Sequence, residues 1–434
     1  MAKRYSKSRK TITSFSSKLL VADAKMTSPF FSGNMSHVVS RMSNACLHRI
    51  AWSQWLGFLA IAFLMSCHEH HTDVPEPPEP HVSRQTVIIF MPWSTNMKEM
   101  FDENIADFEK AIGEGILQDD RVMVCIATSV DRACIIELRL ENGRSVRDTL
   151  QTIDHPYFTN SSQITRMLND IKAIAPARRY SMVAGGHGMA WLPVNATRSF
   201  AAPPFPDKPV TRFFGGLTPL YQIEVSALAQ GIADAGLHME YILFDDCYMA
   251  SVEVAYQLRH VTDYVIGCPT EVMAYGFPYH LCAKMLVGDI DYQGVCDVFH
   301  QFYSNYHMPY GTVAVIDCSE LERLADLAYA IHARYLSDFD PDSDIQSMDG
   351  YTPPLFLDMG DTYDHICKDS VMLASFHEQL ERTVPSKSYT YTYYSAIDGR
   401  HEIRHFSGIT CSEASTNPQA IDSYKMTEWY KATH

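Results

Sequence analysis

The sequence predicts an α/β fold in which a mostly parallel central sheet lies between two layers of helices. Short, continuous apolar runs bounded by turns recur along the chain, and stretches with helical periodicity separate them. Such runs are typical of strands that are buried on both faces of a parallel sheet. Their alternation with helices favours a layered sandwich with right-handed crossover connections. The 434 residues, 46% of them hydrophobic, are enough for one large core and a smaller module.

The expected strands, in chain order, are the apolar runs at 87–91, 122–127, 180–184, 241–244, 264–268 and 312–316. Helices are expected where apolar residues recur every three or four positions. They cover 97–112, 164–174, 225–232 and 321–331, the second ending before Pro176 and the third before Gly236.

Residues 192–221 interrupt this alternation. The segment holds six prolines and little periodicity, and a loop of that length inside a compact domain is usually functional or mobile. After about residue 340 the periodicity is mixed, with a strand-like run at 389–394. We therefore expect four parts, which are an N-terminal region at 1–66, a tether at 67–84, a main domain at 85–340, and a smaller C-terminal α+β module at 341–434 that packs on it.

The net charge of −16 is distributed unevenly. Residues 1–49 carry nine Lys or Arg and one acidic residue, so the remainder of the chain carries a net charge of −24. A body of that charge repels nucleic acid and anionic membranes, and it favours cationic substrates. We therefore expect no nucleic-acid partner.

The N-terminal region has the features of a bacterial lipoprotein signal. An apolar run at 50–66 follows a basic flank, and its uninterrupted apolar part, Leu56–Met65, is about half as long as a membrane-spanning helix. The run leads into Leu64-Met65-Ser66-Cys67, which resembles a lipobox. The resemblance implies a lipid on Cys67 and a location in the cell envelope, at the outer membrane or the surface of a bacterium. An ordinary signal peptide or a short anchor is the alternative. A translation start at Met42 gives the signal a normal length, and the proline-rich stretch after Cys67 is expected to be an extended tether.

Nine cysteines follow Cys67, and none of them form a C-x-x-C pair, which argues against a zinc ribbon. Most lie in apolar patterns, so we expect buried thiols. An odd number leaves at least one cysteine free or paired outside the chain.

Two of the predicted strands end in residues that carry chemistry. The run at 180–184 leads into Gly185-Gly186-His187-Gly188, and the run at 241–244 leads into Asp245-Asp246-Cys247. Sites of parallel sheets gather at the carboxyl ends of strands. A thiol needs a nearby base to become the reactive thiolate, and an imidazole can serve as that base. The N–H groups of Gly188 and Cys247 can form an oxyanion hole. A histidine in a turn and a cysteine in the core are the structural alternative.

A second carboxylate stands directly beside this thiol. Asp246 would disfavour the thiolate of Cys247 if it pointed inward. Because side chains alternate along a strand, we expect Asp245 and Cys247 to point one way and Asp246 to point outward.

The motifs Gly-His-Gly-Met-Ala-Trp191 and Phe-Asp-Asp-Cys-Tyr-Met249 resemble those of the clostripain family of cysteine peptidases, and the likeness extends from about residue 85 to the end of the chain. It implies a caspase-like three-layer sandwich and an endopeptidase with a Cys-His dyad. In that dyad His187 is the base and Cys247 the nucleophile, with the Gly188 and Cys247 amides as oxyanion donors. The resemblance also implies that Asp245 lines the specificity pocket and that cleavage follows Arg or Lys.

Several members of this family mature by cutting their own chain between the histidine and the cysteine. Here Arg198, Lys208 and Arg212 are the candidate processing sites. The expected partners are proteins or peptides with basic residues, and the membrane through the lipid on Cys67. No cofactor is expected to be required. Family members differ in their need for calcium, and the sequence has no EF-hand-like loop.

Two other functions compete with this hypothesis. His401-Glu402-Ile403-Arg404-His405 matches the H-E-x-x-H pattern of zinc peptidases, whose two histidines must share one face of a helix. Asp398-Gly399 before it and Gly408 after it leave barely two helical turns, so we expect no metal there. The remaining alternative is a catalytically weak surface lipoprotein that binds a peptide or a glycan in the same cleft.

Overall fold

The computed structural model describes residues 81–93, 95–194, 215–216, 221–418 and 421–434. All of them belong to one compact unit, Pro77–His434. Cys67 with its lipobox and the candidate processing sites Arg198, Lys208 and Arg212 lie outside the described residues. Within the described ranges, no helix is both long and apolar enough to cross a membrane.

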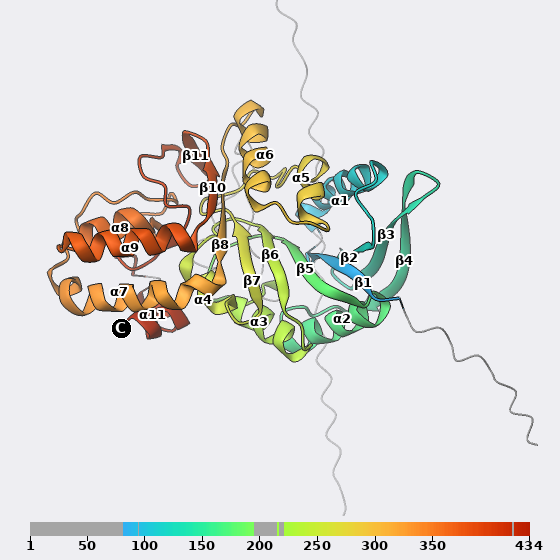
Figure 1. Ribbon diagram of the computed structural model, residues 1–434, viewed down its shortest axis with the longest axis horizontal. Coiled ribbons are helices and arrows are strands. Elements are labelled where there is room, and N and C mark those ends of the chain that lie inside the picture. The colour runs from blue at the N-terminus through green and yellow to red at the C-terminus, as the bar shows by residue number, and fades with distance from the viewer. Residues whose placement is uncertain (1–80, 94, 195–214, 217–220, 419–420) are drawn as a thin grey trace, which may run out of the picture. The chain divides into compact units, whose positions relative to one another are not determined.

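The described strands form one main sheet of nine, in the order β10-β8-β7-β6-β5-β1-β2-β3-β4 (Figure 1). Their bounds are β1 Ser83–Met91, β2 Asp120–Ser129, β3 Arg132–Glu141, β4 Arg144–Asp154, β5 Ala177–Gly185, β6 Met239–Asp245, β7 Thr262–Gly267, β8 Thr312–Asp317 and β10 Ser386–Tyr389. The five central strands, β7-β6-β5-β1-β2, run parallel, and antiparallel strands extend both edges. The predicted sheet is confirmed, and each of the six predicted apolar runs lies in a strand to within one residue.

Helices cover both faces of this sheet (Figure 1). On one face α1 packs against α5 and α5 against α6, and on the other α2 packs against α3 and α3 against α4. Their bounds are α1 Lys98–Gly113, α2 Ser161–Ile174, α3 Val225–Asp234, α4 Val252–Leu258, α5 Tyr279–Leu286 and α6 Tyr292–Asn305. The apolar stripe of α1 faces the sheet, because Phe101, Ile105 and Phe108 are all buried. The predicted helices are therefore confirmed, and they form the two outer layers of a sandwich.

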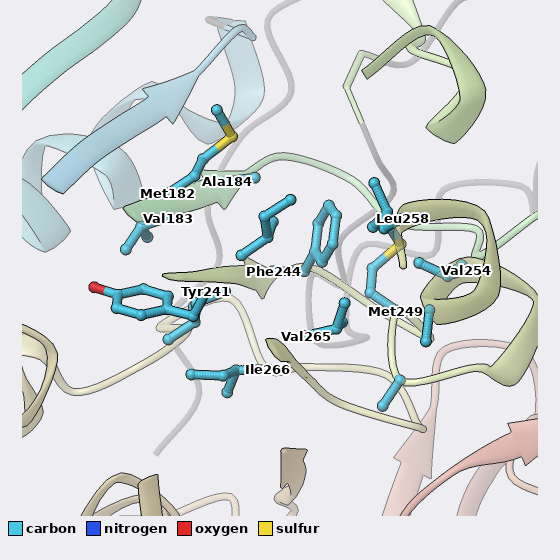
Figure 2. Packing of buried hydrophobic residues seen from close by; sticks show 14 of the residues in the cluster. Met182, Val183, Ala184, Tyr241, Phe244, Met249, Val254, Leu258, Val265 and Ile266 are labelled. Atoms are coloured by element: carbon cyan, nitrogen blue, oxygen red, sulfur yellow. The ribbon is translucent and has the colours of Figure 1, made fainter. Parts of the chain in front are cut away.

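The centre of the sheet is packed with side chains that hold the ends of β5 and β6 in place. Figure 2 shows this packing between β5, β6, β7 and α4, and the residues it labels are fully buried: Met182, Val183, Ala184, Tyr241, Phe244, Met249, Val254, Leu258, Val265 and Ile266. A close-packed interior resists small displacements of its backbone. The loops that follow β5 and β6 therefore begin at strand ends whose positions are fixed by packing.

The chain after β8 builds the rest of the unit from helices and short strands. The bounds are α7 Leu321–Tyr335, β9 Leu357–Asp358, α8 Met359–Ile366, α9 Ser370–Thr383, β11 Thr392–Ser395, β12 Gly399–Glu402, β13 Thr410–Cys411, α10 Ile421–Tyr424 and α11 Glu428–Thr433. This part gives β10 to the edge of the main sheet, antiparallel to β8. It also contacts the segment that follows Cys247, because Thr410 N–H donates to Ala250 O at 3.0 Å.

The nine cysteines of the described ranges are thiols and form no disulfide with one another. Eight of them are buried, and Cys134 is partly exposed. The prediction of buried thiols is confirmed, because most of these cysteines lie in or directly beside strands and helices whose other residues form the core.

A buried carboxyl group lies on α4, six residues after Cys247. Glu253 is 1% exposed, and its Oε1 accepts the Ser412 N–H at 2.8 Å, while no described residue makes a hydrogen bond to its Oε2. Burial raises the pKa of Glu253 from 4.5 to about 7. The folded chain therefore holds this proton more tightly than the unfolded chain does.

The stabilisation that follows is complete below about pH 4.5 and is lost as the pH rises through about 7. Glu253→Gln cannot ionise, so at about pH 8 its free energy of unfolding is expected to exceed that of the parent by about 3 kcal/mol. At about pH 4.5 the two should nearly agree. Urea unfolding of alkylated protein at both pH values measures this, with the part-exposed Glu428→Gln as the control. Parallel pH profiles for parent and Glu253→Gln would contradict it.

Candidate active site

The loops that carry the histidine and the cysteine leave the same edge of the sheet side by side. β5 and β6 are parallel neighbours, with Gly185 paired to Asp245 and Ala184 to Phe244. The next residues along each chain are Gly186-His187-Gly188 and Asp246-Cys247. The expectation that neighbouring strand ends bring these two motifs together is therefore met by the register of the pair.

Asp246 joins the two loops, and the prediction that it points outward is wrong. Its side chain is fully buried, and its Oδ1 accepts the Gly186 N–H at 2.5 Å. The prediction rested on the alternation of side chains along a strand. In the structure β6 lies between β5 and β7, so a side chain leaving its end meets the backbone of the neighbouring loop. The carboxylate fixes the loop that carries His187.

The backbones of Gly188 and Cys247 are in direct contact. A Cβ atom added at Gly188 would lie 2.7 Å from Cys247 N and 2.9 Å from the Asp246 Cβ, and it would collide with Cys247 O. Only a residue without a side chain allows this approach. The two amides that the sequence assigns to an oxyanion hole therefore belong to adjoining stretches of backbone.

Cys247 lies at a tight turn that the following residues hold in place. Its side chain is 1% exposed, and Sγ accepts the Val272 N–H at 3.3 Å. The next residue, Tyr248, has a φ of +63°, a left-handed conformation that is unfavourable for a residue with a side chain. Its hydroxyl donates to Glu271 Oε1 at 2.8 Å, and its ring stacks on Phe356 with centroids 4.8 Å apart. Strain held by such contacts is common at functional sites.

His187 is buried and is oriented by two residues that sequence reasoning missed. Trp93 Nε1–H donates to Asn96 Oδ1 at 2.8 Å, and the Asn96 Nδ2 lies 3.0 Å from His187 Nε2. Both residues follow β1, which is the neighbour of β5 on the side away from β6. The strand-end rule that found His187 and Cys247 would have found Trp93 and Asn96 as well, had it been applied to β1.

Asp245 is fully buried at the end of β6, beneath the loop that carries Cys247. Its Oδ1 accepts the Phe277 N–H at 3.2 Å and its Oδ2 accepts the Tyr279 hydroxyl at 3.0 Å. Both partners belong to the segment at 271–279, in which Val272 contacts Cys247 Sγ. The carboxylate is therefore tied to the same loop as the thiol.

The H-E-x-x-H residues do not form a metal site. His401 and Glu402 are consecutive residues of strand β12, where side chains point to opposite faces. His401 Nε2 contacts Asp398 Oδ1 at 2.6 Å, whereas the nearest carboxylate to His405 is Asp361, at 3.9 Å. A strand cannot place two histidines on one helical face, so this alternative is contradicted. Among the described residues, the cluster of His, Cys, Asp or Glu that could hold a metal includes none of His187, Asp245, Asp246 and Cys247.

Comparisons with known proteins identify relatives of this arrangement. The model of the clostripain family matches residues 95–390. A secreted C11 cysteine protease from Bacteroides thetaiotaomicron is 47% identical over 82% of this chain and 100% of its own, with a TM-score of 0.77. A clostripain from Bacteroides thetaiotaomicron ATCC 29148, solved with the peptide inhibitor BTN-VLTK-AOMK, is 52% identical over 51% of this chain and 99% of its own, with a TM-score of 0.50. An inactive zymogen C11 protease from Parabacteroides distasonis, 24% identical over 82% of this chain and 99% of its own, shares the fold with a TM-score of 0.68. No curated protein matches the chain.

Proposed function

Because the chain belongs to the clostripain family of cysteine peptidases, we propose that it cleaves peptide bonds after Arg or Lys with Cys247 as nucleophile and His187 as acid and base. The observation that carries the proposal is the contact of the Gly188 and Cys247 backbones at the ends of neighbouring parallel strands. This contact brings two N–H groups and a thiol within one small region, as attack on a carbonyl requires.

In this mechanism the Cys247 thiolate attacks the carbonyl carbon of the scissile bond. The Gly188 and Cys247 amides hold the negative charge that develops on the carbonyl oxygen. His187 donates its proton to the departing amine and then accepts one from the water that hydrolyses the thioester. Asp246 has a positioning role, because its bond to Gly186 N–H fixes the loop on which His187 and Gly188 lie.

Three observations support a preference for basic substrates. Asp245 supplies a buried carboxylate two residues before Cys247, and such a carboxylate pairs well with a guanidinium or ammonium group. The chain after residue 49 carries a net charge of −24, which attracts cations. The inhibitor bound to the clostripain from Bacteroides thetaiotaomicron has the peptide VLTK, which ends in lysine.

The test is hydrolysis of matched peptides that differ only in having Arg, Lys, Asp or Gln before the scissile bond, with and without chelator. We expect cleavage after Arg and Lys that survives chelation. In Asp245→Asn the ratio of kcat/KM for Lys over Gln peptides is expected to fall by about 100-fold, because a buried charge pair contributes several kcal/mol.

The ratio separates specificity from folding. Asp245 also binds Phe277 and Tyr279, so a general loss of structure lowers kcat/KM for all peptides alike and leaves the ratio unchanged. An unchanged ratio would remove Asp245 from the specificity pocket. Cleavage after Asp alone, or activity lost with chelator, would contradict the proposed function itself.

Asn96 is expected to orient the His187 ring. Asn96→Ala removes the contact to His187 Nε2 and should lower kcat by about tenfold to a hundredfold with little change in KM, because a misplaced base costs rate more than binding. In Asn96→Asp the new carboxylate favours imidazolium, so the limb of the pH–rate profile set by His187 should move to higher pH. Steady-state kinetics across pH measure both, and an unmoved limb in Asn96→Asp would contradict the assignment.

Processing and location extend the proposal to residues outside the described ranges. We place self-cleavage after Arg198, Lys208 or Arg212, since each offers the basic residue that this specificity requires. We place the enzyme in the cell envelope, anchored through a lipid on Cys67, and the Bacteroides thetaiotaomicron relative is described as secreted.

A further inference from the structure

A second cluster of ligating side chains lies in the C-terminal part of the unit. His332 of α7, Glu413 in the turn after β13 and His434 after α11 each offer one ligand atom, and these atoms lie within 4.8 Å of one another. Glu413 stands between the rings, with Oε2 3.7 Å from His332 Nε2 and Oε1 3.1 Å from His434 Nε2. The His332 and Glu413 side chains are 3% exposed and that of His434 is 19% exposed.

Both imidazoles are held by their other nitrogen. His332 Nδ1 lies 3.1 Å from Thr433 O, and His434 Nδ1 lies 3.1 Å from Tyr430 O. A carbonyl oxygen only accepts hydrogen bonds, so each Nδ1 carries a proton and each Nε2 faces the carboxylate. Metal-binding histidines are oriented in this way, with the second ring nitrogen donating to a carbonyl or a carboxylate.

The ligand atoms lie close to the spacing of a tetrahedral zinc site. Bonds of about 2.0–2.1 Å from zinc to nitrogen and oxygen place neighbouring ligand atoms about 3.3 Å apart. One ligand atom from each of the three residues lies within 4.8 Å of the others, and Glu413 reaches the two rings with different oxygens, Oε1 3.1 Å from His434 Nε2 and Oε2 3.7 Å from His332 Nε2. Two histidines and one glutamate are a known ligand set for zinc, with a fourth position left for water. A cavity of about 310 Å³ adjoins the cluster, lined in part by Glu413, Tyr424 and His434, so a route for an ion and room for a water are present.

We propose that His332, Glu413 and His434 bind one divalent transition-metal ion, with Zn²⁺ the ion that suits them best. The site would join α7 to two later segments, the turn after β13 and the end of α11. None of its residues belongs to the machinery proposed around Cys247.

Two neighbouring tyrosines make hydrogen bonds to the proposed ligands, and a bound ion has to displace them. The Tyr363 hydroxyl lies 2.8 Å from His332 Nε2, where the ion would bind, and the Tyr424 hydroxyl donates to Glu413 Oε2 at 2.7 Å. Without an ion the same cluster is a hydrogen-bonded ion pair, which is the alternative that the experiment must exclude.

The experiment is equilibrium dialysis of metal-stripped protein against Zn²⁺, and a titration with Co²⁺ followed by its visible absorption. The Cys247→Ala form is used so that the reactive thiol cannot bind the metal. We expect one ion per chain and a Co²⁺ spectrum without the intense charge-transfer band of thiolate ligation. Glu413→Gln and His434→Ala should weaken binding by at least about 100-fold, since loss of a second-shell partner alone can cost that much.

His401→Ala is the matched control, because it removes another partly exposed histidine that is paired with a carboxylate outside the cluster. Tyr363→Phe keeps all three ligands and removes the competing hydroxyl, so it should bind the ion at least as tightly. Each variant is also made with Cys247 intact. Its peptidase activity shows whether it folds, and we expect that activity to be unchanged. No ion bound by the parent, a thiolate band in the Co²⁺ spectrum, or unchanged affinity in Glu413→Gln and His434→Ala would overturn the proposal.

Discussion

Cys247→Ala is expected to lower kcat for Arg and Lys peptides by at least about 10⁴-fold, because the loss of a nucleophile removes the covalent route of hydrolysis. The thiol lies at the end of β6 against the Gly188 backbone, where no other described cysteine is placed. The variant loses only a sulfur atom, so its fold and its KM should change little. Kinetics on a matched peptide measure the loss, and the length of the chain by mass spectrometry shows whether self-cleavage at 198–212 stops with it.

Cys134→Ala is the matched control, because Cys134 is the partly exposed thiol among the described cysteines and takes no part in the site. It should retain full activity. Iodoacetamide is expected to label Cys247 far faster than the eight other described thiols, since a base beside a thiol favours the reactive thiolate. Activity that persists in Cys247→Ala would contradict the assignment of the nucleophile.

Gly188→Ala is expected to lower kcat by about 10²- to 10³-fold, the cost of losing an oxyanion donor. The added methyl group would lie 2.7 Å from Cys247 N and would collide with Cys247 O, so the two loops must move apart. Separation displaces both proposed oxyanion donors and moves the loop that carries His187 away from the turn that carries Cys247. Because the methyl group acts at the reacting end of the sheet, the loss should appear in kcat more than in KM.

Gly113→Ala is the control for this substitution. Gly113 ends α1 and a Cβ there meets nothing within 4 Å, so alanine should leave activity unchanged and stability equal or slightly higher. The Tm of Gly188→Ala measured in parallel separates local displacement from unfolding. Full activity in Gly188→Ala would show that the proposed oxyanion hole is placed elsewhere.

The central part of the fold could be predicted because its strands are buried on both faces, which leaves continuous apolar runs. Strand β4, by contrast, has no fully buried position, and the sequence showed no strand there. Helix α4 was missed for the opposite reason. Six of its seven residues are buried, so no polar face marks the helical period.

The site was predictable as far as the strand-end rule was applied. It indicated His187 and Cys247 from β5 and β6, and it left out Asn96, which lies in a short 3-10 turn after β1. The orientation of Asp246 was predicted wrongly, because the alternation of side chains along a strand does not show which backbone lies beside the end of that strand. That information comes only from the packing of the two loops, through the Gly186 N–H.

The contacts between the turn that carries Cys247 and the part of the chain beyond residue 350 have a consequence for the order in which the chain folds. Tyr248 stacks on Phe356, Glu271 accepts the Ser395 hydroxyl at 2.9 Å, and Ala250 O accepts the Thr410 N–H. All three supports lie beyond residue 350, so a chain still being synthesised carries Cys247 long before it carries what holds the turn. Strain at Tyr248 without these supports favours other conformations of the loop. The turn that carries Cys247 is therefore expected to reach its folded conformation only once the chain beyond residue 350 has been made.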